Sequence, residues 1–256
     1  MADFFIGSDN RLELFGPLHI AISAVFVLLY AAVFVFRKRL RGFGHFKAVR
    51  IAAATLLLVN MVIHYGSRII LGIWSFESDL PLHLCFLTNF FMIYILYTDN
   101  KGGLYRIIYY FTFIGPLPAM IWPDLRSSYD SYIFYQFIIS HHIMLLISLY
   151  CLCVLRYETK VRYSLHTLLF GNILIGAVML FNMYFGTNYI MMAELPAQLY
   201  EIYPFLYALP PLVWLELVGV AAVYASCIPM AIVHRADADK SDRKPQNGEP
   251  RDRQRL

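Results

Sequence analysis

Charged side chains are scarce in this chain. Asp, Glu, Lys and Arg together make up 15% of its 256 residues, whereas apolar residues make up 59%. Soluble domains of ordinary composition carry about 25% charged residues, so this balance argues against a water-soluble fold and is typical of a protein dissolved in lipid. The formal charge of +4 is small, and its basic residues lie in short connections and a tail, where membrane topology explains them. We therefore expect no nucleic-acid partner.

Several sequence motifs are also missing. The four cysteines form no C-x-x-C pair and have no histidine spacing that resembles a zinc site, so neither a disulfide framework nor a metal is expected. There is no P-loop or Gly-rich nucleotide motif, and no cofactor is expected. The first residues, MADFFIGSDN, lack a basic n-region, and the first apolar run ends in RKRLR. We expect this run to stay as a helix and not to be cleaved as a signal peptide.

Apolar runs near 20 residues predict an all-α membrane protein with about seven transmembrane helices. We place the spans at 15–36, 51–73, 81–98, 107–122, 133–155, 164–184 and 205–233. Residues 1–233 thus form a transmembrane domain. The charged segment 234–256 has no apolar periodicity and is predicted to be a disordered tail. We also expect a helix on the membrane surface within 185–204, and a kink at Pro210 and Pro211.

The distribution of basic residues predicts the orientation of these helices. Outside the spans, 18 Lys and Arg residues lie in the first, third and fifth connections and the tail, against two before the first span and in 123–132. By the positive-inside rule, the amino terminus is external and the carboxyl terminus cytoplasmic. We expect an integral protein of the bacterial plasma membrane.

The second span carries a polar stripe. Asn60, His64 and Arg68 recur every four residues and therefore share one face of an α-helix. Polar side chains are costly in hydrocarbon, so this face is predicted to point into the bundle. Arg68 has an alternative interpretation, in which its side chain extends towards the outer headgroups.

The third span places a thiol close to a helix amino terminus. Asp79 is the expected N-cap and Pro81 falls in the first turn, which puts Cys85 in the second turn. Asn89 follows four residues later and shares the face of Cys85, whereas His83 points elsewhere unless the first turn is irregular. A buried cysteine can also be a small apolar side chain without chemistry.

Further polar residues gather in the same outer half of the bilayer. The fifth span contributes Ser140, His141 and His142, the sixth ends at Asn182 before Asn188, the first carries His19, and Glu216 is expected near mid-membrane. Asn182 and Asn188 can serve simply as hydrogen-bond formers at a helix end, and Glu216 can be protonated and structural. Cys151, Cys153 and Cys227 fall in the inner half.

This combination suggests acyl transfer. A thiol attacks carbonyl carbon only as thiolate, and a helix amino terminus with a neighbouring His or Arg favours that form. Because the polar cluster is inside the bilayer, a phospholipid ester is the substrate that suits its position.

The run Leu80-Pro81-Leu82-His83-Leu84-Cys85 resembles the YwaF-like group of bacterial membrane proteins, related to transmembrane protein 164, a phospholipid acyltransferase. Ile139-Ser140-His141 is similar to the histidine segment of that family, and Asn182 with Gly186-Thr187-Asn188-Tyr189 is similar to its motif after the sixth helix. The resemblance implies that Cys85 carries a transient acyl group and that a helix-five histidine, His141 or the adjacent His142, is the base.

The sequence therefore predicts an acyltransferase of membrane phospholipids that acts through an acyl-cysteine intermediate. The expected catalytic residues are Cys85, His141 and His142, and the expected substrate-binding residues are Arg68, His64, His83, Asn89, Asn182 and Asn188. The alternative is a non-catalytic transporter or receptor that binds a small ligand in the same polar cavity.

Overall fold

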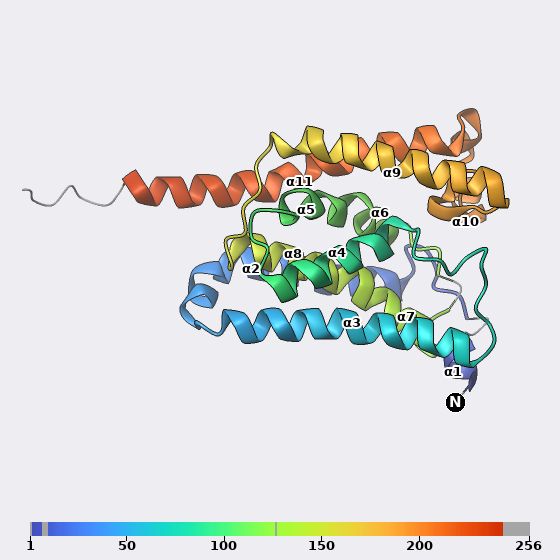
Figure 1. Cartoon of the computed structure of the whole chain (residues 1–256), viewed down its shortest axis with the longest axis horizontal. Helices are drawn as coiled ribbons and strands as arrows, with labels where there is room; N and C mark the ends of the chain where they lie inside the picture. The colour runs from blue at the N-terminus through green and yellow to red at the C-terminus, as the bar shows by residue number, and fades with distance from the viewer. Residues whose placement is uncertain (1, 7–9, 126, 243–256) are drawn as a thin grey trace, which may run out of the picture.

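The computed structural model describes residues 2–6, 10–125 and 127–242, and every regular element within these ranges is helical. The long helices run side by side and a loop-rich end carries the short helices α1 (Ala2–Ile6) and α10 (Ala197–Ile202) (Figure 1). Five segments are long and apolar enough to cross a membrane. They are α2 (Pro17–Gly42), α3 (Phe46–Ile70), the helical stretch Tyr132–Cys153, α9 (Tyr163–Phe185) and α11 (Pro211–Asp242). The chain is thus an all-helical integral membrane protein.

Two more apolar segments are helical but short. The span expected at 81–98 is α4 (Leu84–Thr98), and the span expected at 107–122 is divided into α5 (Tyr105–Ile114) and α6 (Pro116–Ile121). At 1.5 Å per residue, α4 is only about 22 Å long, less than the hydrocarbon thickness of about 30 Å. Five membrane-length helices are therefore found where seven spans were expected, and the seven-span topology stays a prediction.

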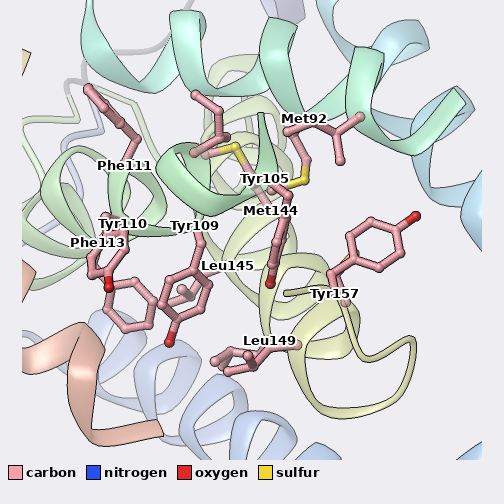
Figure 2. Packing of buried hydrophobic residues seen from close by; sticks show 14 of the residues in the cluster. Met92, Tyr105, Tyr109, Tyr110, Phe111, Phe113, Met144, Leu145, Leu149 and Tyr157 are labelled. Carbon is pink, nitrogen blue, oxygen red and sulfur yellow. The ribbon is translucent and has the colours of Figure 1, made fainter. Parts of the chain in front are cut away.

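The centre of the bundle is α5, whose side chains pack against α4, α8 (Met144–Cys153) and α11 (Figure 2). Its tyrosines are buried and each hydroxyl has a carbonyl partner: Tyr105 donates to Ser148 and Tyr109 donates to Ser226, both at 2.8 Å. Such interhelical hydrogen bonds contribute about 0.6 to 2 kcal/mol each within a membrane. They fix α5 against its neighbours, and α5 in turn supports the start of α4.

The first connection differs from the expected loop over 37–50. Helix α2 continues to Gly42 and α3 starts at Phe46, so only residues 43–45 connect them. Arg41, in the last turn of α2, donates from Nε to the Cys153 carbonyl at 2.9 Å. Basic side chains stabilise the carboxyl end of a helix. Arg39 and Arg41, in the last turn, therefore favour the extension of α2 beyond its apolar part.

The expected kink at Pro210 and Pro211 is wrong, because α11 begins at Pro211, where a missing N–H is harmless. Residues 204–208 form the short 3-10 helix η3 (Pro204–Ala208), and the proline inside α11 is Pro229. Glu216 accordingly lies only about 8 Å from the start of the helix, and not at its middle.

Helix α11 also continues past residue 233, after which the tail was expected to begin. Residues 243–256 of that tail lie outside the described residues.

The segment between α9 and α11 contains more than the single surface helix expected within 185–204. It holds η2 (Tyr189–Met191), α10 and η3. These short elements cover the loop-rich end of the bundle, beside the start of α4 (Figure 1).

Candidate functional site

A cavity of about 520 Å³ lies at this end of the bundle, between α4, α6, α11 and the segment 190–206. Its wall is mostly apolar, with three groups suited to acyl-transfer chemistry: His83, Cys85 and His141. Asp124 also lines it and forms an ion pair with Arg11 at 3.6 Å. The cavity therefore combines apolar walls with a thiol and two imidazoles from separate parts of the sequence.

Cys85 is positioned by the first turn of α4. The helix begins at Leu84 after a tight turn in which the Leu82 amide donates to the Leu80 carbonyl at 2.7 Å, and His83 is the N-cap. The expected start near Asp79 is thus wrong, and Cys85 lies in the first turn instead of the second. The first N–H groups of a helix have no partner within it and favour negative charge nearby.

Asp79 and Arg68 pair with each other. Arg68 Nε lies 2.8 Å from Asp79 Oδ1, and Arg68 Nη2 donates to the Ile73 carbonyl at 3.2 Å. Asp79 Oδ2 accepts from the Ser75 amide at 2.7 Å instead of capping α4. Arg68 does not line the cavity; it holds the connection between α3 and α4.

Asn89 joins the nucleophile helix to the histidine segment. Its Nδ2 donates to the Cys85 carbonyl at 2.8 Å and to the Ser140 carbonyl at 3.1 Å. Asn89 does not itself line the cavity. A single amide therefore fixes the backbone of Cys85 relative to the residue that precedes His141.

The histidine segment is not regular α-helix. Between α7 (Tyr132–Ile138) and α8 lies a π-helix, η1 (Ile139–Ile143), with the sequence ISHHI. Short π-helices inside α-helices are rare and frequently mark functional sites. As in any helix, the two adjacent histidines point in different directions.

His141 faces the cavity, whereas His142 faces α2. His141 Nδ1 lies 2.9 Å from both the Phe137 carbonyl and the Ser140 hydroxyl. The carbonyl can only accept, so donation to it places the proton on Nδ1 and makes Nε2 the basic nitrogen. His142 is absent from the cavity wall; its ring stacks on Phe26 at 4.4 Å and its Nδ1 lies 3.3 Å from the Tyr30 hydroxyl. Of the two candidate bases, only His141 lines the cavity that Cys85 also lines.

His83 has the opposite tautomer. Its Nδ1 lies 3.3 Å from the Ile190 amide, which can only donate, so the neutral ring carries its proton on Nε2. His83 lines the cavity together with Cys85. This corresponds to the alternative of an irregular first turn, because His83 is the extended N-cap before α4. One imidazole of the cavity therefore offers a basic nitrogen and the other offers an N–H donor.

Asn182 and Asn188 shape the cavity wall without lining it. Asn182 Nδ2 donates to the Tyr189 carbonyl at 2.9 Å, and its Oδ1 accepts from the Tyr189 amide at 3.0 Å. Asn188 closes the same loop with bonds to Glu194 and Ala193. These bonds support Ile190 and Met191, cavity residues that have φ values of 62° and 59°. A β-branched residue with positive φ is strained, and strain of this kind is concentrated at functional sites.

Tyr189 ties the loop to the connection before α4. Its hydroxyl donates to the Phe76 carbonyl and accepts from the Leu80 amide at 3.0 Å. Burial raises the pKa of the Tyr189 phenol, so it stays protonated and keeps this donor. The resemblance to a family motif over 186–189 thus corresponds to a structural junction.

The remaining residues of the polar stripe point into the bundle as expected. Asn60 and His64 are buried, and the His64 ring stacks on Phe86 at 5.4 Å, one residue after Cys85. His64 does not line the cavity.

Three residues that line the cavity were missed by the sequence interpretation: Gly115, Trp122 and Trp214. Gly115, between two apolar helices and before a proline, was the only one with a sequence signal.

The chain is a polytopic α-helical membrane protein with a cavity lined by a thiol and two imidazoles. The chain belongs to the TMEM164 family, whose family model matches residues 14–230. It is also similar to an uncharacterized protein of Treponema pallidum (strain Nichols), with 28% identity over 190 residues that cover 73% of this chain and 78% of the relative. No solved structure matches the chain significantly.

Proposed function

We propose that this protein is a phospholipid acyltransferase that carries the fatty acyl chain on Cys85. The observation that supports this most is the placement of Cys85 and His141 in one apolar cavity of about 520 Å³. This volume is in the range of about 300 to 1,000 Å³ that is typical of sites for small ligands. An apolar wall suits an acyl chain, and the polar groups lie where its carbonyl would react.

The first half-reaction forms a thioester. His141 Nε2 takes the thiol proton, Cys85 Sγ attacks the ester carbonyl carbon, and the carbonyl π electrons move onto oxygen. His83 Nε2–H donates a hydrogen bond to this oxyanion, as the donors of an oxyanion hole do. When the tetrahedral intermediate collapses, the carbon–oxygen ester bond breaks and the leaving alkoxide takes the proton from His141.

The second half-reaction reverses these steps with another hydroxyl. His141 removes its proton, the oxygen attacks the thioester carbonyl, and Cys85 leaves as thiolate and recovers the proton. The acceptor hydroxyl belongs to a second lipid or to water. No step requires a metal or a redox cofactor.

The other expected site residues act in this proposal through position. Asn89 holds Cys85 and the η1 backbone at a fixed separation. Asn182 and Asn188 hold the cavity wall, and Arg68 with His64 supports the connection into α4. By the positive-inside rule, the cavity lies in the outer half of the plasma membrane, where membrane phospholipids can reach it.

The test is turnover of a phospholipid with a labelled acyl chain in proteoliposomes. Cys85→Ser should lose at least about a hundredfold in rate, because an alcohol is not ionised under conditions that ionise a thiol. His141→Gln should lose about 10² to 10⁴-fold, as expected for a general base. Cys227→Ala and His142→Gln are matched controls and should retain the wild-type rate.

Wild-type turnover by Cys85→Ser would contradict the acyl-enzyme. Saturable lipid binding without turnover, even by the unmodified protein, would favour the non-catalytic transporter or receptor that the same cavity could serve.

A further inference from the structure

A second apolar hollow, a groove of about 350 Å³, lies between α2 and α8. Leu29, Phe36 and Leu40 recur at helical spacing and form one wall from a single face of α2, and Leu146 of α8 contributes to the other wall. The side chains of Leu29 and Phe36 are 41% and 53% exposed, so the groove is open to the surrounding lipid. Among the described residues, it shares no lining residue with the proposed active-site cavity. It is therefore a separate site.

One charged side chain lines this apolar groove. Arg39 lies in the last turn of α2, is exposed, and forms no hydrogen bond or ion pair with the residues that the structure describes. Its neighbours Arg37 and Arg41, by contrast, donate to the carbonyls of Phe34 and Cys153. A guanidinium binds phosphate well, through two parallel N–H···O bonds. Arg39 is thus available to bind an anion that is not part of the chain.

The length of the groove matches one leaflet of a bilayer. At 1.5 Å per residue, the distance from Leu29 to Arg39 along α2 is about 15 Å, half of the hydrocarbon thickness of about 30 Å. Helix α2 begins at Pro17 and has risen about 30 Å at Arg37, which places Arg39 at the level of the headgroups. The positive-inside rule predicts that these are the cytoplasmic headgroups, which include anionic lipids. An acyl chain can thus lie along the groove while its phosphate reaches Arg39.

We propose that this groove binds one anionic phospholipid of the cytoplasmic leaflet, with an acyl chain along Leu29 and Phe36 and the phosphate on Arg39. Basic pockets between transmembrane helices on the cytoplasmic side bind anionic headgroups in this way. A zwitterionic lipid carries the same phosphate, but its ammonium group would be repelled by the basic run RKRLR at 37–41. The site binds without chemistry and does not depend on the proposed acyl transfer.

The experiment is native mass spectrometry of the full, delipidated chain in detergent, titrated with phosphatidylglycerol or with phosphatidylcholine of the same acyl chains. The wild-type protein should retain one phosphatidylglycerol about tenfold more tightly than phosphatidylcholine. Arg39→Gln should weaken the binding of phosphatidylglycerol about tenfold, as expected for the loss of a charged hydrogen bond.

Lys38→Gln is the matched control for the loss of charge. Lys38 is the adjacent basic residue and is exposed, but it does not line the groove. Its removal weakens only the screened attraction at longer range, so binding should stay within about twofold of the wild type.

A second pair of variants tests the apolar part of the groove without a change of charge. Ala32 lines the groove, and Ala32→Phe should reduce the affinity for phosphatidylglycerol about fivefold or more, because the acyl chain loses its packing contacts. Ala31→Phe adds the same ring at an exposed position outside the groove and should bind as the wild type does. Inorganic phosphate at the same concentrations should not displace the lipid, because phosphate has no acyl chain to fill the groove.

Three results would overturn the inference. Equal retention of phosphatidylglycerol by Arg39→Gln and Lys38→Gln would show that general attraction to the basic run explains the binding. Displacement by inorganic phosphate would show that the site binds a free anion and no lipid. A wild-type dimer that Ala32→Phe converts to a monomer would make a second copy of the chain the occupant of the groove.

Discussion

Backbone hydrogen-bond partners distinguish the two imidazoles of the cavity. His141 Nδ1 faces a carbonyl and His83 Nδ1 faces an amide N–H, so their free nitrogens are a base and a donor respectively. The Ser140 hydroxyl also lies 2.9 Å from His141 Nδ1. A pair of neutral rings with complementary tautomers can remove a proton at one side of a reacting carbon and stabilise charge at the other.

Gly115 is a second residue whose backbone neighbours determine its role. It separates α5 from α6, and a Cβ there would lie 3.2 Å from Leu84 Cβ and 3.3 Å from the Cys85 amide nitrogen. These atoms belong to the start of α4, which would have to shift. We expect Gly115→Ala to slow phospholipid turnover about tenfold, since small displacements of reacting groups are costly in rate.

Gly219→Ala provides the matched control for this prediction. Its Cβ would meet Ile114 Cγ2 at 3.7 Å, which is an ordinary contact on the neighbouring helix. Turnover per folded protein should therefore stay near the wild-type value. A Gly115→Ala variant as active as Gly219→Ala would show that the start of α4 tolerates displacement and does not need this close approach.

At the scale of helices, the apolar runs predict the positions of the long elements because length and hydropathy alone are required to cross a bilayer. The helix ends are less predictable. Basic residues after the apolar part lengthen α2 to Gly42, and tertiary contacts delay the start of α4 to Leu84. Asp79 has the side chain of an N-cap, but its ion pair with Arg68 takes precedence.

The π-helix η1 could not be predicted from the sequence. Ile139–Ile143 is apolar apart from Ser140 and the two histidines, and adjacent histidines point in different directions in an α-helix as well as in a π-helix. The local pattern of apolar and polar residues thus contains no signal for the wider turn of the π-helix. The polar stripe of α3 was predictable as an inward face, but its distance from the cavity depends on how α3 packs against α4.

At the scale of the whole molecule, charge asymmetry predicts which side of the membrane holds the cavity. A reporter fused after Leu256 should be cytoplasmic and one before Met1 external, because 18 basic residues lie on one side of the predicted spans and two on the other. Protease protection in sealed vesicles measures both. If both termini were on the same side, one of the short segments, α4 or α5–α6, would not cross the membrane.

The most direct measurement of the central claim is the mass of the Cys85-containing peptide after the protein meets its lipid. Proteoliposomes with an isotopically labelled acyl chain on the phospholipid are quenched in acid and digested without reductant. We predict a labelled acyl adduct on Cys85 that neutral hydroxylamine releases, as it does thioesters, and that is absent in Cys85→Ala. Asn89 and His83 variants should form it more slowly. Phospholipid turnover by the wild-type protein with no adduct at Cys85, or with the label on another residue, would contradict the account.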